Sequence, residues 1–491
     1  MPRAVPRCWR SLLAWAALGG LLAVAWNLKH PLLYWLRPCE TALLLAVAVV
    51  GGSAALRQPP AQRSPGRRRL LAIGLLALAG LTLWRELEFQ VDRRHVLAGG
   101  RDMQMLGEHF IVGFRSFAEV EPLAARGLIG GIYLTRRNLL PDGVVTVAAG
   151  IARLQEARRL AGLPPLIVAA DQEGGPVAHL SPWLERLPAL SSLVHAAPPE
   201  TLAVRARLHG ERQGASLAAL GVNLNLAPVV DLRPSEPDAV LAFLTGSGGR
   251  AIDDDPAVVT EVARAYVAGL ADAGVGATLK HFPGLGRVRE DTHLRRASLA
   301  ATAEDLRGDW QPFRSVGNGS RAAIMLGHVV LRAVDPDHAV SHSRIVVQNV
   351  LRGQWGYRGV LITDDLNMGA VYGQGIGRVA AQSLAAGVDL VLVSYDPDQY
   401  FRALSGAARA LVRGDVDRPS LKASCRRLRA LGVGNHGAPG QDSVAVAPAP
   451  AGSAAGSHSA SAGAPMAVAD RPDAAASPAS WLQSLSSFCD R

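Results

Sequence analysis

The sequence predicts an α/β protein whose main domain is a (β/α)8 TIM-type barrel preceded by three transmembrane helices. Two observations predict the barrel: short apolar runs alternate with amphipathic segments, and polar residues follow successive runs. A third observation, three long apolar stretches near the N-terminus, predicts the membrane helices. A doubly wound open sheet is the alternative to the barrel, although no Gly-x-Gly-x-x-Gly motif follows the first run.

Eight short apolar runs are expected to form the parallel strands, because helical patterns long enough for a crossover separate most of them. The predicted strands cover residues 110–113, 130–134, 166–170, 222–227, 277–280, 323–326, 360–363 and 390–393. The clearest helical patterns cover residues 144–160, 202–220, 258–273, 344–355 and 377–386.

The apolar stretches 11–26, 41–56 and 70–84 each approach the roughly 17 to 25 residues that cross a bilayer as a helix. A cleaved signal peptide would account for only one of them. Residues 1–100 hold 13 of the 51 Lys and Arg but only 4 of the 41 Asp and Glu, so most of the net charge of +10 lies there. This distribution indicates membrane topology and argues against a nucleic-acid partner.

Arginines precede the first stretch and crowd residues 57–69, between the second and the third. The positive-inside rule therefore predicts a multi-pass protein of the cytoplasmic (inner) membrane, with everything after residue 84 on the periplasmic or extracellular side. We divide the chain into a membrane anchor (1–84), a polar connector (85–104), the barrel (105–433) and a tail (434–491). The tail is rich in Ala, Ser, Gly and Pro and is expected to be disordered, since it has few large apolar residues to bury.

The run KHFPGLGRVREDTH, from Lys280 to His293, places Asp291 two residues before His293. A carboxylate that accepts a hydrogen bond from one imidazole nitrogen leaves the other nitrogen to exchange a proton near neutral pH. An isolated Asp-x-His is usually an ordinary polar turn. Here, however, polar residues also follow five successive predicted strands, where a barrel carries its active site. These residues are Asp171, Gln172, Glu173, Asp231, Lys280, His281, His328, Asp364 and Asp365.

A carboxylate that faces a proton donor in a barrel mouth suits glycoside hydrolysis. The run ITDDLNM supplies the carboxylate and the Asp291–His293 pair supplies the donor. Because side chains alternate along a strand, Asp364 should share the inward face of Val360 and Ile362, whereas Asp365 should cap the following turn. Glu173 and His328 are interpreted as structural residues and Asp231 as a turn cap.

Four ordered blocks make residues 105–433 similar to the catalytic barrel of glycoside hydrolase family 3, in particular its bacterial β-N-acetylglucosaminidases. The blocks are ADQEGG (170–175), GVNLNLAPVVDL (221–232), KHFPGLG with its DTH extension, and GVLITDDLNM (359–368). The resemblance implies that Asp364 is the nucleophile, His293 the general acid/base and Asp291 its partner. It further implies that Asp171, Lys280 and His281 hold sugar hydroxyls and that Arg250 helps to seat the N-acetyl sugar.

The resemblance implies a retaining exo-β-N-acetylglucosaminidase that hydrolyses terminal β-linked GlcNAc, from peptidoglycan-derived saccharides or muropeptides, and the three apolar stretches imply that it is anchored in the membrane. No cofactor or metal is predicted, because the His residues lack ligand spacing. A β-N-acetylglucosaminide phosphorylase, another β-glycosidase of the family and a non-catalytic sugar-binding envelope protein remain alternatives. The aglycone preference stays open, since Pro176 and His179 stand where the family often has arginine.

Overall fold

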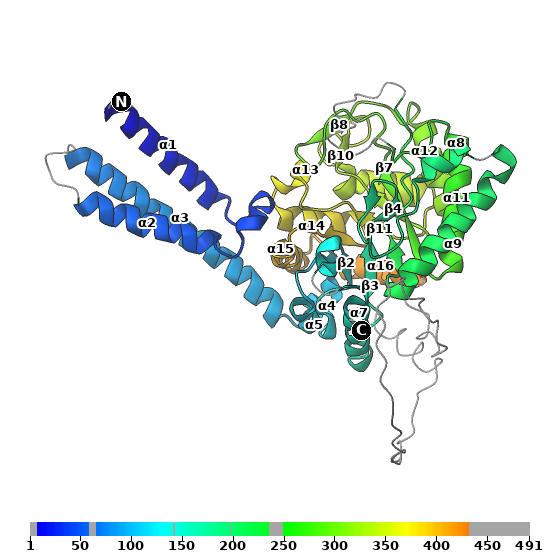
Figure 1. Ribbon diagram of the computed structural model, residues 1–491, viewed down its shortest axis with the longest axis horizontal. Helices are drawn as coiled ribbons and strands as arrows, with labels where there is room; N and C mark the ends of the chain where they lie inside the picture. Colours follow the sequence, from blue (N-terminus) through cyan, green and yellow to red (C-terminus); the bar gives the residue numbers. More distant parts are fainter. Residues whose placement is uncertain (1–6, 58–64, 141–142, 197, 235–248, 432–491) are drawn as a thin grey trace, which may run out of the picture.

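A computed structural model describes residues 7–57, 65–140, 143–196, 198–234 and 249–431. Figure 1 shows a β/α barrel from which a helical arm extends. The arm consists of α1 (Arg7–Trp26), α2 (Glu40–Arg57) and α3 (Pro65–Ala98), and the short helix η1 (Pro31–Leu36) lies between α1 and α2. The predicted tail at 434–491 lies outside the described residues.

Among the described residues, eight parallel strands form the barrel in the order β11-β9-β7-β6-β3-β2-β1-β12. A bridge between Ile362 and Leu390 joins the two ends of this sheet, so the ring is nearly closed. The predicted barrel is therefore confirmed, and the open-sheet alternative was wrong. The strands are Phe110–Val112 (β1), Gly131–Leu134 (β2), Ile167–Ala170 (β3), Leu224–Asn225 (β6), Gly276–Phe282 (β7), Ala323–Leu326 (β9), Leu361–Thr363 (β11) and Val391–Val393 (β12).

Helices cover the outside of the ring (Figure 1). They are α5 (Phe117–Ala125), α7 (Gly143–Leu160), α9 (Leu202–Leu220), α11 (Pro256–Asp272), α12 (Arg307–Asn318), η5 (Ile345–Gln354, a π-helix), α14 (Ile376–Ala386), α15 (Gln399–Arg413) and α16 (Arg418–Ala430). Shorter elements at the strand ends and loops are α4 (Arg101–Gly107), β4 (Gln172–Gly174), β5 (Val177–Ala178), α6 (Arg136–Leu139), α8 (Leu190–Ala196), η3 (Pro199–Thr201), β8 (Ala297–Leu299), β10 (Val329–Leu331), η4 (Val340–His342) and α13 (Gly369–Tyr372).

Alternation along the strands divides the core in two. Ile111 on β1 and Ile362 on β11 belong to the small cluster inside the ring, whereas Phe110 and Val112 belong to the large cluster between ring and helices. Each strand is buried on both faces, which explains why the barrel strands are apolar runs instead of alternating patterns.

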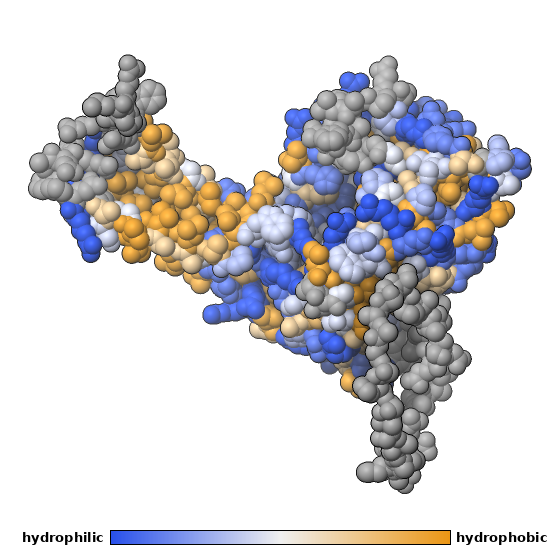
Figure 2. Space-filling view, viewed as in Figure 1, coloured by the Kyte–Doolittle hydropathy of each residue, from blue (hydrophilic) through white to orange (hydrophobic). Residues whose placement is uncertain are grey.

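The arm differs in part from the prediction of three transmembrane helices. Among the described residues, only the helix Gly66–Ala98 is long and apolar enough to cross a bilayer, and the apolar helices Leu12–Trp26 and Glu40–Ala54 are shorter. A bilayer crossing needs about 17 or more apolar residues, and these two described apolar stretches, which lie within the longer helices α1 and α2, stay below that number. Apolar residues nevertheless cover the arm in Figure 2, and Leu76 and Trp84 are examples of its exposed side chains.

The predicted connector at 85–104 is helical along most of its length, because α3 continues to Ala98 and α4 begins at Arg101. The second half of α3 packs against α15 of the barrel. Asp92 forms an ion pair with Arg409 at 2.8 Å, and the rings of Phe89 and Phe401 meet edge to face. The arm therefore joins the barrel through side-chain contacts as well as through the chain.

Candidate active site

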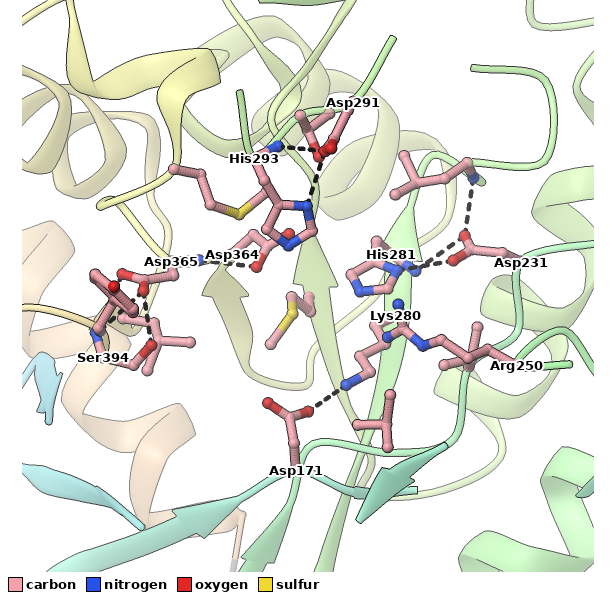
Figure 3. A pocket seen from close by; sticks show the side chains of 18 of the residues that line it. Asp171, Asp231, Arg250, Lys280, His281, Asp291, His293, Asp364, Asp365 and Ser394 are labelled. Carbon is pink, nitrogen blue, oxygen red and sulfur yellow. Dashed lines mark hydrogen bonds and ion pairs between the residues drawn. The ribbon is translucent and has the colours of Figure 1, made fainter. Parts of the chain in front are cut away.

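The carboxyl ends of the strands open into a cavity of about 1970 Å³. Every residue that the sequence analysis assigned to the site lines this cavity: Asp171, Arg250, Lys280, His281, Asp291, His293 and Asp364. Figure 3 shows how these side chains converge from several strand ends. Parallel strands bring this about, because all their carboxyl ends lie at one side of the ring.

Asp364 follows β11 and reaches the cavity on the inward face that it shares with Ile362. Its Oδ1 accepts the backbone N–H of Asp365 at 2.8 Å. Burial alone would raise the pKa of Asp364, but the nearby imidazoles of His281 and His328 and this hydrogen bond hold the pKa below the usual aspartate value. Asp364 is therefore kept as an anion although it is half-buried, as a nucleophilic carboxylate requires.

Asp365 lies in a different environment, although it is the next residue. Its carboxylate accepts the backbone N–H of Asn367 at 3.0 Å, as the predicted turn cap should. It also accepts the hydroxyl of Ser394 at 2.7 Å and the backbone N–H of Tyr395 at 3.0 Å, which ties the end of β11 to the end of β12. Burial raises the pKa of Asp365, so the two neighbouring carboxyls are pushed in opposite directions.

His293 stands on the loop between β7 and β8 and extends toward Asp364 in Figure 3. Its Nδ1 lies 2.9 Å from Oδ1 of Asp291, and its side chain is 62% exposed. The same Oδ1 accepts the backbone N–H of His293 at 2.8 Å. Asp291 thereby fixes the ring and leaves Nε2 as the nitrogen that is free to exchange a proton with a ligand.

Lys280 on β7 is buried between two carboxylates. Its Nζ contacts Oδ1 of Asp171 and lies 2.7 Å from Oε1 of Glu173, and Glu173 also accepts two hydrogen bonds from Arg250 at 2.7 and 2.9 Å. Burial disfavours the charged form of each group, but the attraction between the opposite charges is the stronger effect. The pKa of Asp171 and of Glu173 is therefore lowered, and the pKa of Lys280 is raised. The network presents fixed charges and donors to a polar ligand.

His281, the next residue on β7, is held by Asp231. The Nδ1 of His281 lies 2.7 Å from Oδ2 of Asp231, whose Oδ1 accepts the backbone N–H groups of His281 and Leu285. Burial would raise the pKa of Asp231, but His281 and these N–H groups lower it. Asp231 is thus a positioning carboxylate as well as the turn cap that its sequence position indicates.

Sequence reasoning missed part of the site. Glu173 bridges Arg250 and Lys280, and Tyr133 on β2 donates its hydroxyl hydrogen bond to Asp171 at 2.6 Å. The position of Glu173 after a strand was a usable signal, whereas Tyr133 lies inside an apolar run that gives none. His328, interpreted as a packing residue, is buried, and its Nε2 lies 3.0 Å from the carbonyl oxygen of Asp365.

The arrangement supplies the parts that a double-displacement reaction at an acetal needs. One half-buried carboxylate is kept ionised, and an exposed imidazole on a loop is oriented by a second carboxylate. Around them, a charged network offers hydrogen bonds to hydroxyl groups. Such a pair can attack a carbon from one side and protonate a leaving oxygen on the other.

Comparisons with known proteins agree with this geometry. Beta-hexosaminidases of Xanthomonas campestris pv. campestris (strain B100) and of Xylella fastidiosa (strain 9a5c) are each 38% identical over 285 and 286 residues. These alignments cover 57% of this chain and 81% and 80% of those proteins.

Solved structures agree as well. A glycoside hydrolase family 3 beta-N-acetylglucosaminidase from Paenibacillus sp. str. FPU-7 matches with a TM-score of 0.62 and 32% identity, over 70% of this chain and 64% of that chain. The Beta-N-acetylhexosaminidase from Beutenbergia cavernae DSM 12333 matches with a TM-score of 0.60 and 32% identity, over 68% and 98% of the two chains. Since the Glycosyl hydrolase family 3 N terminal domain also matches residues 103–431, which span the whole barrel and its site, the chain belongs to glycoside hydrolase family 3.

Proposed function

We propose that the protein is a retaining exo-β-N-acetylglucosaminidase, anchored in the cytoplasmic membrane, that removes terminal β-linked GlcNAc from peptidoglycan-derived glycosides. The observation that carries the proposal is the presence of Asp364 and the Asp291–His293 pair in one cavity. The names of the similar proteins, beta-hexosaminidase and beta-N-acetylglucosaminidase, support GlcNAc as the sugar that is removed.

The proposed reaction has two steps. A carboxylate oxygen of Asp364 attacks the anomeric carbon while Nε2–H of His293 gives its proton to the departing glycosidic oxygen, so a glycosyl ester forms and the aglycone leaves as an alcohol. His293 then takes a proton from water, whose oxygen attacks the anomeric carbon and releases Asp364 as a carboxylate. Two displacements restore the original β configuration. Asp171, Lys280 and Arg250 hold the hydroxyl and acetamido groups of the sugar meanwhile.

The activity is tested with the full-length protein in detergent. Aryl β-GlcNAc should be hydrolysed much faster than aryl β-glucoside, and proton NMR should show the β anomer as first product. An Asp364→Asn variant serves as the control for contaminating hydrolase. The α anomer as first product would contradict a retaining mechanism, and sugar 1-phosphate formed on addition of inorganic phosphate would identify a phosphorylase instead.

Membrane anchoring rests on the arm. α3 is long and apolar enough to cross a bilayer, and apolar side chains of the other two helices are exposed beside it. The segment between α1 and α2 contacts the barrel directly, with Arg37 between Asp396 and Asp398, so this segment and the barrel lie on the same side of the membrane.

Cys39 offers a topology test, since it is exposed in this same segment. A membrane-impermeant maleimide applied to intact spheroplasts should label the protein, and Cys39→Ser should remove that label. Labelling of Cys39 only after the membrane is broken would contradict the proposed orientation. Release of free GlcNAc from purified peptidoglycan fragments tests the substrate separately.

A further inference from the structure

The segment between α1 and α2 reaches the mouth of the catalytic cavity. Pro31, Leu32 and Tyr34 belong to the lining of this cavity, together with residues of the barrel loops. These three residues lie outside the region that matches glycoside hydrolase family 3, which begins at residue 103. Part of the wall of the active site is therefore supplied by the N-terminal arm.

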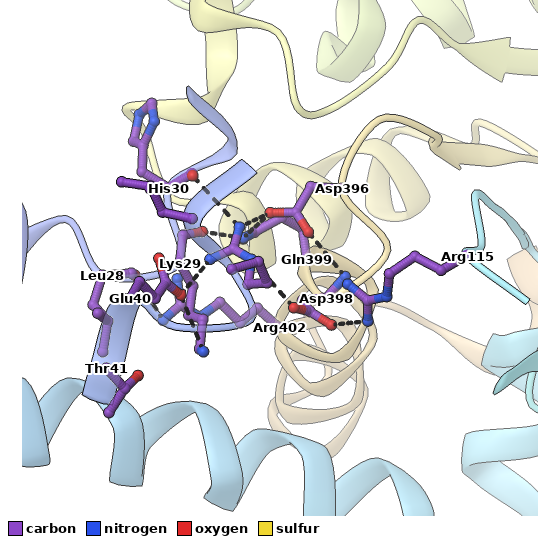
Figure 4. A network of polar contacts seen from close by, with 12 residues as sticks. Leu28, Lys29, His30, Glu40, Thr41, Arg115, Asp396, Asp398, Gln399 and Arg402 are labelled. Carbon is purple, nitrogen blue, oxygen red and sulfur yellow. Dashed lines mark hydrogen bonds and ion pairs between the residues drawn. The ribbon is translucent and has the colours of Figure 1, made fainter. Parts of the chain in front are cut away.

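Buried ion pairs hold this segment on the barrel (Figure 4). Arg37 contacts Asp396, lies 3.2 Å from Asp398 and 2.8 Å from Glu40, and its side chain is only 6% exposed. The carbonyl oxygen of Lys29 accepts a hydrogen bond from the side-chain amide of Gln399. Buried charges held by several partners define one position of a segment, because any other position would leave a charge unpaired.

The docked segment completes a group of aromatic rings around one cation. The guanidinium of Arg137 lies 5.0 Å from the ring centre of Tyr34, 5.2 Å from that of Trp35 and 4.8 Å from that of Tyr395. Among the described residues, no carboxylate pairs with Arg137. Its N–H groups are thus available to oxygen atoms of a ligand, while the rings hold the cation in place.

This group adjoins the proposed nucleophile. The backbone N–H of Tyr395 donates to the carboxylate of Asp365, the residue after Asp364, at 3.0 Å. Tyr34, Arg137 and Tyr395 all line the same cavity as Asp364 and His293. A ligand whose reacting carbon sits at Asp364 can therefore extend its leaving side along these rings.

We propose that Tyr34, Arg137 and Tyr395 form an aglycone subsite that binds the sugar on the reducing side of the cleaved bond. Through this subsite, the arm favours saccharides over glycosides of small alcohols as substrates. The inference rests on the proposed glycosidase function and adds to it. Aromatic faces pack against the apolar C–H face of a pyranose ring, and the guanidinium N–H groups donate to its hydroxyls. The N-terminal arm then has a role in specificity in addition to its proposed role as an anchor.

Two substrates that share an alcohol leaving group test the subsite. N,N′-diacetylchitobiose places a second sugar on the leaving side, whereas methyl β-GlcNAc places only a methyl group there. With the full-length protein in detergent, Tyr34→Ala and Arg137→Gln should lower kcat/KM for chitobiose by about tenfold, mainly through KM, as expected for a lost stacking or cation contact. Both variants should stay within about twofold of the wild type on the methyl glycoside.

Control variants separate the subsite from a structural effect. Tyr34→Phe keeps the ring and should keep most of the activity on chitobiose. Trp84→Ala removes an exposed aromatic side chain from α3 and should change neither substrate. Equal losses on both substrates, or no loss on chitobiose, would overturn the subsite. A wild-type protein that cleaves neither substrate would instead overturn the proposed function on which the inference rests.

Discussion

Oδ1 of Asp291 accepts the backbone N–H of His293 at 2.8 Å and lies 2.9 Å from Nδ1 of the same residue. One carboxylate oxygen thus fixes both the backbone and the ring of the residue that we propose as the acid/base. A glutamic acid would donate a proton as one side chain, whereas here proton transfer requires both the imidazole of His293 and the carboxylate of Asp291 that orients it. The pair stands on a loop, so its position depends on what anchors that loop.

His293→Ala should slow hydrolysis of substrates with poor leaving groups by about 10²- to 10⁴-fold and of activated aryl glycosides much less. The reason is that a departing alkoxide needs a proton, whereas a nitrophenolate leaves without one. Asp291→Ala should show the same pattern in a milder form, because the imidazole remains but loses its fixed orientation. A series of aryl β-GlcNAc substrates of graded leaving-group acidity measures the effect, and a loss independent of the leaving group would exclude the acid role.

Asp364→Asn should abolish turnover and leave the melting temperature near that of the wild type, since the side chain accepts, within the described part of the chain, one hydrogen bond from the adjacent backbone N–H of Asp365. Asp365→Asn should lower the melting temperature, because its carboxylate joins the ends of β11 and β12 through Ser394 and Tyr395. A 5-fluoro glycosyl inactivator followed by peptide mass mapping should label Asp364. A label on Asp365 would contradict the assignment.

Gly369→Ala should lower kcat on the order of 10²-fold by moving the acid/base loop. The N–H of Gly369 donates to the carbonyl oxygen of His293 at 2.8 Å, and an added Cβ would lie 2.4 Å from the carbonyl oxygen of Leu294. The loop would have to shift, and His293 with it. Gly373→Ala is the matched control, because a Cβ there meets no atom within 4 Å. If Gly369→Ala were as active as Gly373→Ala, the loop would not depend on this contact.

Acid should destabilise the protein through His342. Burial, with smaller contributions from His328 and His338, lowers the pKa of His342 to about 3. The unfolded chain takes up a proton at His342 near pH 6.5, whereas the folded protein does so only near pH 3. The contribution of His342 to the free energy of unfolding is therefore complete above pH 6.5 and is lost as the pH falls from 6.5 toward 3. The loss is about 2 kcal/mol at pH 5 by linkage.

The test compares the change in melting temperature between pH 7 and pH 5. His342→Gln should show a smaller decrease than the wild type, because the amide does not take up a proton. His195→Gln should show the same decrease in melting temperature as the wild type, because the side chain of His195 is exposed in the folded protein. Equal decreases in all three proteins would show that His342 does not govern the acid sensitivity.

Local patterns in the chain were sufficient to predict the barrel and several of the residues that line its cavity. Apolar runs at 323–326 and 390–393 predict strands because a strand buried on both faces has no polar alternation. The inward direction of Asp364 follows from the two-residue period of a strand, and its place at the mouth follows from the rule that parallel strands end together.

Which distant residues meet could not be predicted from local patterns, because it depends on how the helices and strands pack. The bridge of Glu173 between Arg250 and Lys280, the hold of Asp231 on His281 and the docking of residue 29 on residue 399 join parts of the chain that share no local pattern. The same holds for the extension of α3 through the predicted connector. Such contacts depend on which surfaces the packed barrel brings within a few ångströms, because hydrogen bonds and direct ion-pair contacts form only at that distance. That is why the arm was predicted as an anchor and its place in the wall of the active site was not.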